Sequence, residues 1–223
     1  MNSTVILKGN ILYTPRPSEF ISIQHGYIIA VDGVVVYCGE SIPPAYTDCE
    51  VTDYGDNLII PGFVDTHAHA PQYCNRGLGM DKELLPWLET YTFPEEAKFS
   101  DLDYARLVYG AFVQDLWRNG TTRSILFGTI HKESTLVLME LLQKAGLSAY
   151  VGKVNMDRNS PDFLIEETNQ SLADTKDWLE ASAQFGPLVK PIITPRFVPS
   201  CTSELMDGLG TLSEEYKVPV QSH

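Results

Sequence analysis

Two histidines separated by one residue, His67 and His69, are the clearest chemical signal in the sequence. They end the run LIIPGFVDTHAH, whose continuous apolar part is typical of a parallel strand buried on both faces. Residues i and i+2 of a strand project from the same side, so both imidazoles face one space. Imidazole nitrogens suit zinc or iron, and one rigid strand presents both ligands in a fixed geometry. The pair therefore predicts a metal site at the end of this strand.

A third histidine, His223, ends another apolar segment, VPVQSH. A lone histidine is seldom a metal ligand, but this one closes a predicted strand, as His67 and His69 do. The carboxyl ends of the parallel strands of a barrel open toward one face. We therefore expect His223 to lie beside the other two.

From residue 58 onward, strand and helix patterns alternate, and these are the elements that must position the histidines. The alternation predicts a parallel α/β fold, either an open doubly wound sheet or part of a (β/α)8 TIM-type barrel. No GxGxxG or GxxxxGK[ST] motif occurs, and polar residues gather where strands end, which favours the barrel. Predicted strands cover residues 58–69, 121–127, 147–154, 187–195 and 218–223, and predicted helices cover 101–119, 132–145, 161–183 and 203–217.

The limits of the first predicted helix, residues 101–119, follow from the residues at its two ends. Ser100 is the expected N-terminal cap, and Gly120 is the expected stop. Leu102, Ala105 and Phe112 recur on one face, which is expected to be buried.

The first 57 residues have a different pattern, with β-branched and aromatic runs between tight-turn signals. Asp32-Gly33 is predicted to close a hairpin. We expect a small antiparallel β unit over residues 1–57 and the barrel portion over residues 58–223.

The number of predicted units is too small for a complete barrel, which typically needs about 250 residues and eight strand–helix pairs. The chain has 223 residues, contains the first five predicted strand–helix units, the fifth by its strand alone, and stops at a strand tip. We therefore expect it to be the first part of a longer protein.

Composition excludes several classes of partner. A net charge of −13 argues against binding to nucleic-acid phosphates. No apolar run approaches the about 18–20 residues of a membrane span, and the start lacks the pattern of a secretory signal. The four cysteines, Cys38, Cys49, Cys74 and Cys201, have no metal-binding spacing, so we expect reduced thiols in a cytoplasmic protein.

Longer motifs point to a family. The segments PGFVDTHAHAPQY and QSH resemble the amidohydrolase superfamily. Within it, YTFPEE (91–96), VGKVNMD (151–157) and TPRF (194–197) resemble guanine deaminases. The similarity covers residues 58–223, and the N-terminal unit is similar to the small β-sandwich that flanks such barrels and is completed by a C-terminal segment outside this chain.

The resemblance implies one metal ion per subunit, zinc or else iron, held by His67, His69 and His223. It implies hydrolysis of guanine to xanthine and ammonia by a metal-activated water. The remaining ligands and the proton-transferring glutamate are expected beyond residue 223, so no catalytic residue is identified within the chain. We also expect a homodimer that acts on a small purine.

The resemblance further implies that Gln72, Arg196 and Phe197 bind substrate, together with His69 and His223. An amide can donate to and accept from a purine edge, a guanidinium pairs with a carbonyl such as O6, and a ring can stack on the base. The alternatives are a solvated loop residue for the glutamine, a surface salt-bridge partner for the arginine and a core residue for the phenylalanine.

Three other residues bear on the site. Trp87 is expected in the pocket wall, and His131, after the second predicted strand, is expected behind the ligands. Lys190 begins the fourth predicted strand, away from its carboxyl end, so it does not suit the bridging lysine of binuclear relatives.

Two other functions remain open. An enzyme of the same class would deaminate or dechlorinate another heterocycle, such as a triazine or an adenine-like ring. A protein of another class would be a non-catalytic fragment that binds only a metal or a partner.

Overall fold

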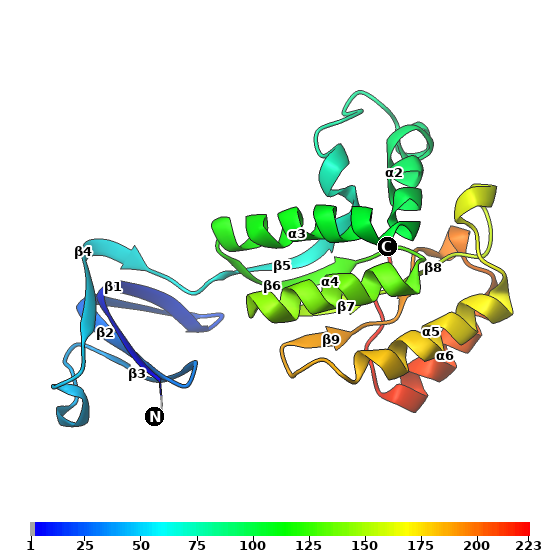
Figure 1. Ribbon diagram of the computed structural model, residues 1–223. Coiled ribbons are helices and arrows are strands. Elements are labelled where there is room, and N and C mark those ends of the chain that lie inside the picture. Colours follow the sequence, from blue (N-terminus) through cyan, green and yellow to red (C-terminus); the bar gives the residue numbers. More distant parts are fainter. Residues whose placement is uncertain (1–2) are drawn as a thin grey trace. The chain divides into compact units, whose positions relative to one another are not determined.

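The computed structural model describes residues 3–223, and the chain divides into two compact units, Met1–Gly62 and Phe63–His223 (Figure 1). No helix within the described residues is both long and apolar enough to cross a membrane.

The first unit contains a four-stranded sheet in the order β3-β2-β1-β4. The hairpin at Asp32-Gly33 is confirmed, because β2 and β3 pair antiparallel across it and both turn residues have positive φ, 50° and 80°. The last strand, β4, pairs with β1 in parallel, so the expectation of a purely antiparallel unit was wrong. A crossover connection of eleven or so residues, which contains the 3-10 turn η1 (Pro44–Tyr46), brings the chain back in the direction of β1. The strands are β1 (Thr4–Arg16), β2 (Glu19–Val31), β3 (Val34–Gly39) and β4 (Val51–Ile59).

The second unit is built on a parallel sheet in the order β5-β6-β7-β9, and β8 and β10 form a separate two-stranded parallel sheet. This confirms a parallel α/β fold. The strands are β5 (Phe63–His69), β6 (Thr121–Phe127), β7 (Ser148–Gly152), β8 (Val154–Asn155), β9 (Val189–Pro191) and β10 (Thr194–Pro195).

The fifth predicted strand, residues 218–223, is reduced to a single parallel bridge between Ile193 and Val220. Pro219 has no N–H to give to a ladder, although its carbonyl accepts from Ile193 N at 2.9 Å. Farther along, Gln221 N donates to Ile193 O at 2.9 Å and His223 N donates to Arg196 O at 3.1 Å. The expected full strand is therefore wrong, but the segment still runs beside the sheet and delivers His223 to its edge.

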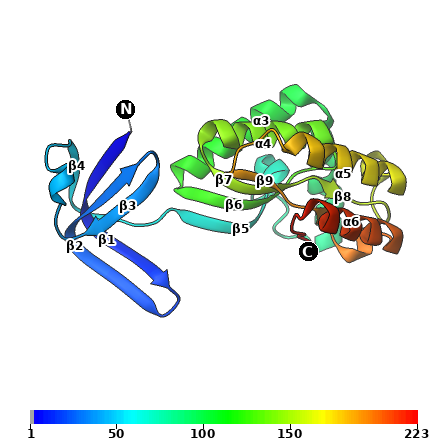
Figure 2. The same ribbon diagram turned by 90° about the horizontal axis from the view of Figure 1, so that it is seen from below.

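Four long helices follow the strands, and α3 and α4 lie side by side along the sheet (Figures 1 and 2). Their inner faces share one apolar core with the sheet, which includes Tyr109, Leu138 and Trp178. The helices are α3 (Leu102–Arg118), α4 (Lys132–Ala145), α5 (Thr168–Ser182) and α6 (Ser203–Tyr216).

Two helix limits differ from expectation. Asp101, not Ser100, caps α3, because its carboxylate accepts from the backbone N–H groups of Asp103 and Tyr104. Leu102, at the first position of the helix, is exposed rather than buried. The predicted helix 161–183 is divided into η5 (Asp162–Leu164) and α5, whose start is capped by Glu167.

An excursion of short helical turns connects β5 to α3, and the sequence patterns did not predict it. It starts with η2 (Ala70–Asn75), directly after the two histidines. It continues through α1 (Leu84–Trp87), the π-helical turn η3 (Leu88–Thr92), α2 (Phe93–Ala97) and η4 (Lys98–Ser100). The turn η6 (Val198–Ser200) connects β10 to α6.

Gly152, at the end of β7, allows the backbone there to lie very close to Ile192 and Thr194. A Cβ atom added there would lie 1.8 Å from Thr194 Oγ1 and 2.8 Å from the carbonyl oxygen of Ile192. We expect Gly152→Ala to lower the free energy of unfolding by about 1–3 kcal/mol, because backbone and side chain must both move. Denaturant unfolding measures the loss.

The matched control is Gly110→Ala within α3, where an added Cβ meets no atom within 4 Å. That change should stabilise the protein by up to about 1 kcal/mol, because alanine is the better helix former. A Gly152→Ala protein as stable as wild type would contradict the close approach.

Candidate metal centre

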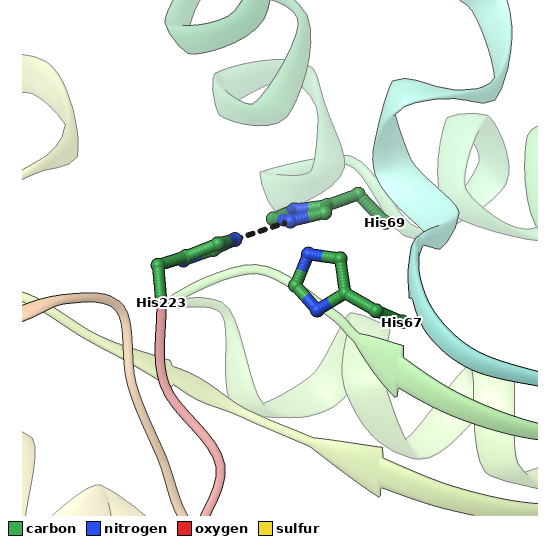
Figure 3. Close-up of side chains that lie close together, drawn as sticks. All are labelled: His67, His69 and His223. Carbon is green, nitrogen blue, oxygen red and sulfur yellow. Dashed lines mark hydrogen bonds between the residues drawn. The ribbon is translucent and has the colours of Figure 1, made fainter.

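Three imidazoles lie together at the carboxyl end of the sheet (Figure 3). β5 projects His67 and His69 toward the same space, and the final segment brings His223 to them. One ring nitrogen from each lies within 4.8 Å of the others, so the three residues could hold one metal ion. The shortest of these contacts joins His69 Nε2 and His223 Nε2 at 2.8 Å.

Phe127 packs against all three rings, and sequence reasoning missed it. It is fully buried at the end of β6, and its ring centroid lies 4.5 Å from those of His69 and His223 and 5.0 Å from that of His67. Phe127 is the last residue of the second predicted strand, and the ends of parallel strands meet at one edge. Its position in the sequence could therefore have indicated that it lies near the histidines. The aromatic ring excludes water from one side of the cluster.

Burial keeps the rings of His69 and His223 neutral. It lowers the pKa of His69 to about 2, with a further contribution from the charge of Arg196, and it also lowers the pKa of His223. His223 Nδ1 lies 2.6 Å from the Arg196 carbonyl oxygen, which can only accept, so Nδ1 carries the proton. The Nε2 lone pair of His223 then faces His69. A neutral ring whose second nitrogen donates to a carbonyl is the usual form of a metal-binding histidine.

A buried hydrogen-bond network lies beside the histidines. Arg196 donates to both carboxylate oxygens of Glu96, Nη1 to Oε2 at 2.5 Å and Nη2 to Oε1 at 3.1 Å. Both residues are nearly fully buried, with exposures of 3% and 1%. Gln72 Nε2 lies 3.1 Å from Glu96 Oε1 and 3.1 Å from His69 Nδ1. Gln72, Glu96 and Arg196 therefore form one network that ends on a candidate ligand.

Arg196 thus has a salt bridge, but a buried one rather than the surface pair that was the alternative. Glu96 had no role in the sequence reasoning, although it lies in the YTFPEE motif. The sequence offered only an indirect indication of Glu96: a guanidinium such as that of Arg196, if buried, needs a carboxylate nearby.

A pocket of about 310 Å³ opens over this network, and two of its walls are Trp87 and Phe197. Arg196, His223 and Gln72 also line it. Trp87 is held by a hydrogen bond from Nε1 to Leu78 O at 3.0 Å. A larger pocket of about 430 Å³ also borders His67 and His69, but neither Arg196 nor His223 lines it. The smaller pocket is the better candidate for substrate, because convergent polar groups meet apolar walls there.

Two residues lie apart from this cluster. His131 precedes α4, and burial followed by the charge of Lys153 lowers its pKa. It is not one of the three grouped histidines. Lys190 is exposed in the middle of the short strand β9, where it pairs with Tyr150 of β7, and it is not one of the residues that could hold the metal.

Relatives of known name match the chain along most of its length. Guanine deaminase of Dictyostelium discoideum is 53% identical over 174 residues, which are 78% of this chain and 39% of that protein. Guanine deaminase of Escherichia coli K12 is 39% identical over 211 residues, 90% of this chain and 47% of that protein. The chain therefore spans less than half the length of these curated relatives.

A solved structure agrees with them. The crystal structure of guanine deaminase from C. acetobutylicum with bound guanine in the active site superposes with a TM-score of 0.95 at 52% identity. The match covers 99% of this chain and 53% of that one. The model of the amidohydrolase family matches residues 58–223. This chain belongs to the amidohydrolase family.

Proposed function

We propose that the protein containing this chain is a guanine deaminase that hydrolyses guanine to xanthine and ammonia. The observation that supports this most is the pocket in which two imidazoles of the three-histidine cluster, those of His69 and His223, adjoin the guanidinium of Arg196 and the amide of Gln72. Metal-ligating and purine-binding groups are thereby combined in one space. The relatives' names point to the same activity.

The metal in this proposal is a single zinc ion, with iron as the alternative, held by His67, His69 and His223. When bound, it would supply a water molecule that is acidic enough to lose its proton near pH 7. The neutral state of His69 and His223 fits this role, because a protonated imidazole cannot ligate.

The purine in this proposal is held by Gln72, Arg196 and Phe197, with the ligands His69 and His223 at the edge of its pocket. A guanidinium has five N–H groups, and the two bonds to Glu96 use two of them. The others can donate to the O6 carbonyl of guanine. Phe197 offers an aromatic ring on which the base can stack.

The architecture of the whole enzyme is also part of the proposal. Residues 58–223 would supply the first five strand–helix units of a TIM-type barrel, and residues 1–57 would supply part of a β-sandwich. Exposed apolar side chains on β3, Val34, Val35 and Val36, support a second β layer against the first unit. We further propose a cytoplasmic homodimer that uses one metal ion per subunit.

Ammonia release tests the proposed activity. Because this chain spans less than half the length of its curated relatives, the assay uses the gene's whole product. We expect release from guanine and far less from adenine or melamine, since only guanine presents a ring carbonyl to Arg196. Release from a triazine or adenine without release from guanine would favour another heterocycle, and no release from any ring would favour a non-catalytic protein.

Removal of a ligand tests the metal centre. His67→Ala and His69→Ala should each lose most of the bound metal and all measurable deamination, while the circular dichroism spectrum stays the same. The fold should persist because the ligands are carried by a strand that packing already holds. Elemental analysis of purified protein measures the metal.

The control for this test is His25→Asn, at an exposed position of β2 with φ of 50°, which asparagine tolerates. It should keep wild-type metal content. Equal metal in the His67→Ala and wild-type proteins would show that the ion is bound elsewhere.

Arg196 provides a test of substrate recognition. Arg196→Ala should lower kcat/KM for guanine at least about 10-fold, since a charged hydrogen bond to a buried acceptor contributes about 1.5–3 kcal/mol. Lysine should restore only part of it, because an ammonium lacks the planar fork. Steady-state kinetics measures kcat/KM, and elemental analysis of the same preparations measures the metal content, which should not change.

Arg196→Ala also leaves Glu96 without its buried partner, which costs about 3–5 kcal/mol, so a lower melting temperature should accompany the kinetic loss. An Arg196→Ala enzyme that deaminates guanine at the wild-type rate would remove Arg196 from the substrate site.

A further inference from the structure

Glu96 connects the two residues proposed to recognise the purine. It lies on α2, Gln72 lies on η2 after β5, and Arg196 follows β10. The Oε1 atom of Glu96 accepts from both partners, at 3.1 Å from Arg196 Nη2 and 3.1 Å from Gln72 Nε2. One carboxylate oxygen thus holds two groups that come from elements far apart in the sequence.

The chemistry of a carboxylate decides which way the Gln72 amide points. An ionised carboxylate can only accept, so Gln72 must turn its NH2 group toward Glu96. The amide oxygen of Gln72 is then the end available to a ligand. Arg196 presents only N–H groups, and Glu96 Oε2 fixes its plane through the second bond, from Nη1 at 2.5 Å.

We propose that Glu96 is a positioning residue that sets a donor from Arg196 beside an acceptor from Gln72. The inference rests on the proposed function. This pattern complements the edge of a lactam ring such as guanine, where a C6 carbonyl acceptor adjoins an N1–H donor. Adenine presents the reverse, an amino donor beside a ring-nitrogen acceptor. Glu96 therefore selects 6-oxopurines without touching the ring.

The neighbouring Glu95 differs from Glu96 in its partners and provides the control. It is also buried, but it accepts from Tyr104 of α3 and, at 2.6 Å, from Lys98 Nζ. These contacts tie α2 to α3 and do not reach the pocket residues. The same substitution at the two adjacent positions therefore separates positioning from the general support of α2.

The experiment measures competitive inhibition of the whole gene product by hypoxanthine, a 6-oxopurine, and by adenine. In Glu96→Gln the side chain keeps its shape but offers a donor as well as an acceptor, so Arg196 loses one bond and the Gln72 amide can reverse. We expect the preference for hypoxanthine over adenine to fall at least about 10-fold. KM for guanine should rise more than kcat falls, and metal content should stay at the wild-type level.

Glu95→Gln should retain the wild-type preference, whatever it does to the melting temperature. Glu96→Asp retains the charge that Arg196 needs but shortens the reach toward Gln72, so it should fold and show a smaller loss of preference than Glu96→Gln. If Glu96→Gln does not fold, Glu96→Asp must show the loss by itself.

Several outcomes would overturn the inference. These are an unchanged preference in the folded Glu96 variants, an equal weakening of both inhibitors, or the same change in Glu95→Gln. A wild-type protein that releases no ammonia from guanine is a different result, seen before any variant is made. It would overturn the proposed function, and this inference with it.

Discussion

The buried ion pair between Arg196 and Glu96 is the constraint on which the site depends. A guanidinium with 3% exposure is tolerated only with a carboxylate in close, two-point contact. The pair joins the turn after β10 to α2 and thereby fixes the excursion between β5 and α3 over the sheet edge. The backbone of Arg196 also helps to build the site, because its carbonyl accepts from His223 Nδ1 and sets the orientation of that ring.

The three histidines are arranged by packing in a form that suits a metal. Phe127 packs against all of them, and burial keeps His69 and His223 neutral. A hydrogen-bond chain then runs from the Arg196 carbonyl through both rings to Gln72 and Glu96. The metal centre and the purine pocket are therefore joined by one chain of hydrogen bonds.

Local patterns predicted the long elements well and the irregular ones poorly. The predicted strand 121–127 matches β6, and the helices α3, α4 and α6 follow from apolar periodicity. The predicted strand 58–69 instead begins in β4 and continues in β5, and the predicted strands 147–154 and 187–195 are each divided in two. The parallel pairing of β4 depends on the path of a crossover connection, which no local pattern encodes. The segment after Val218 has the composition of a strand, but Pro219 cannot donate a backbone hydrogen bond, and the segment keeps a single parallel bridge, between Ile193 and Val220. The N-terminal cap of α3 is Asp101 and not the predicted Ser100, because the aspartate side chain accepts from the first N–H groups of the helix.

The sequence alone determined the candidate ligands, because alternation along a strand places His67 and His69 on one side whatever surrounds them. It also determined the family, through motifs that span most of the chain. Only the tertiary structure decided that Glu96 pairs with Arg196, since the partner of a buried charge is chosen by proximity between residues 100 positions apart. The same holds for Phe127 beneath the imidazoles and for the orientation of Gln72. Those relations depend on which strand ends and turns meet in space, and spacing along one chain does not contain that information.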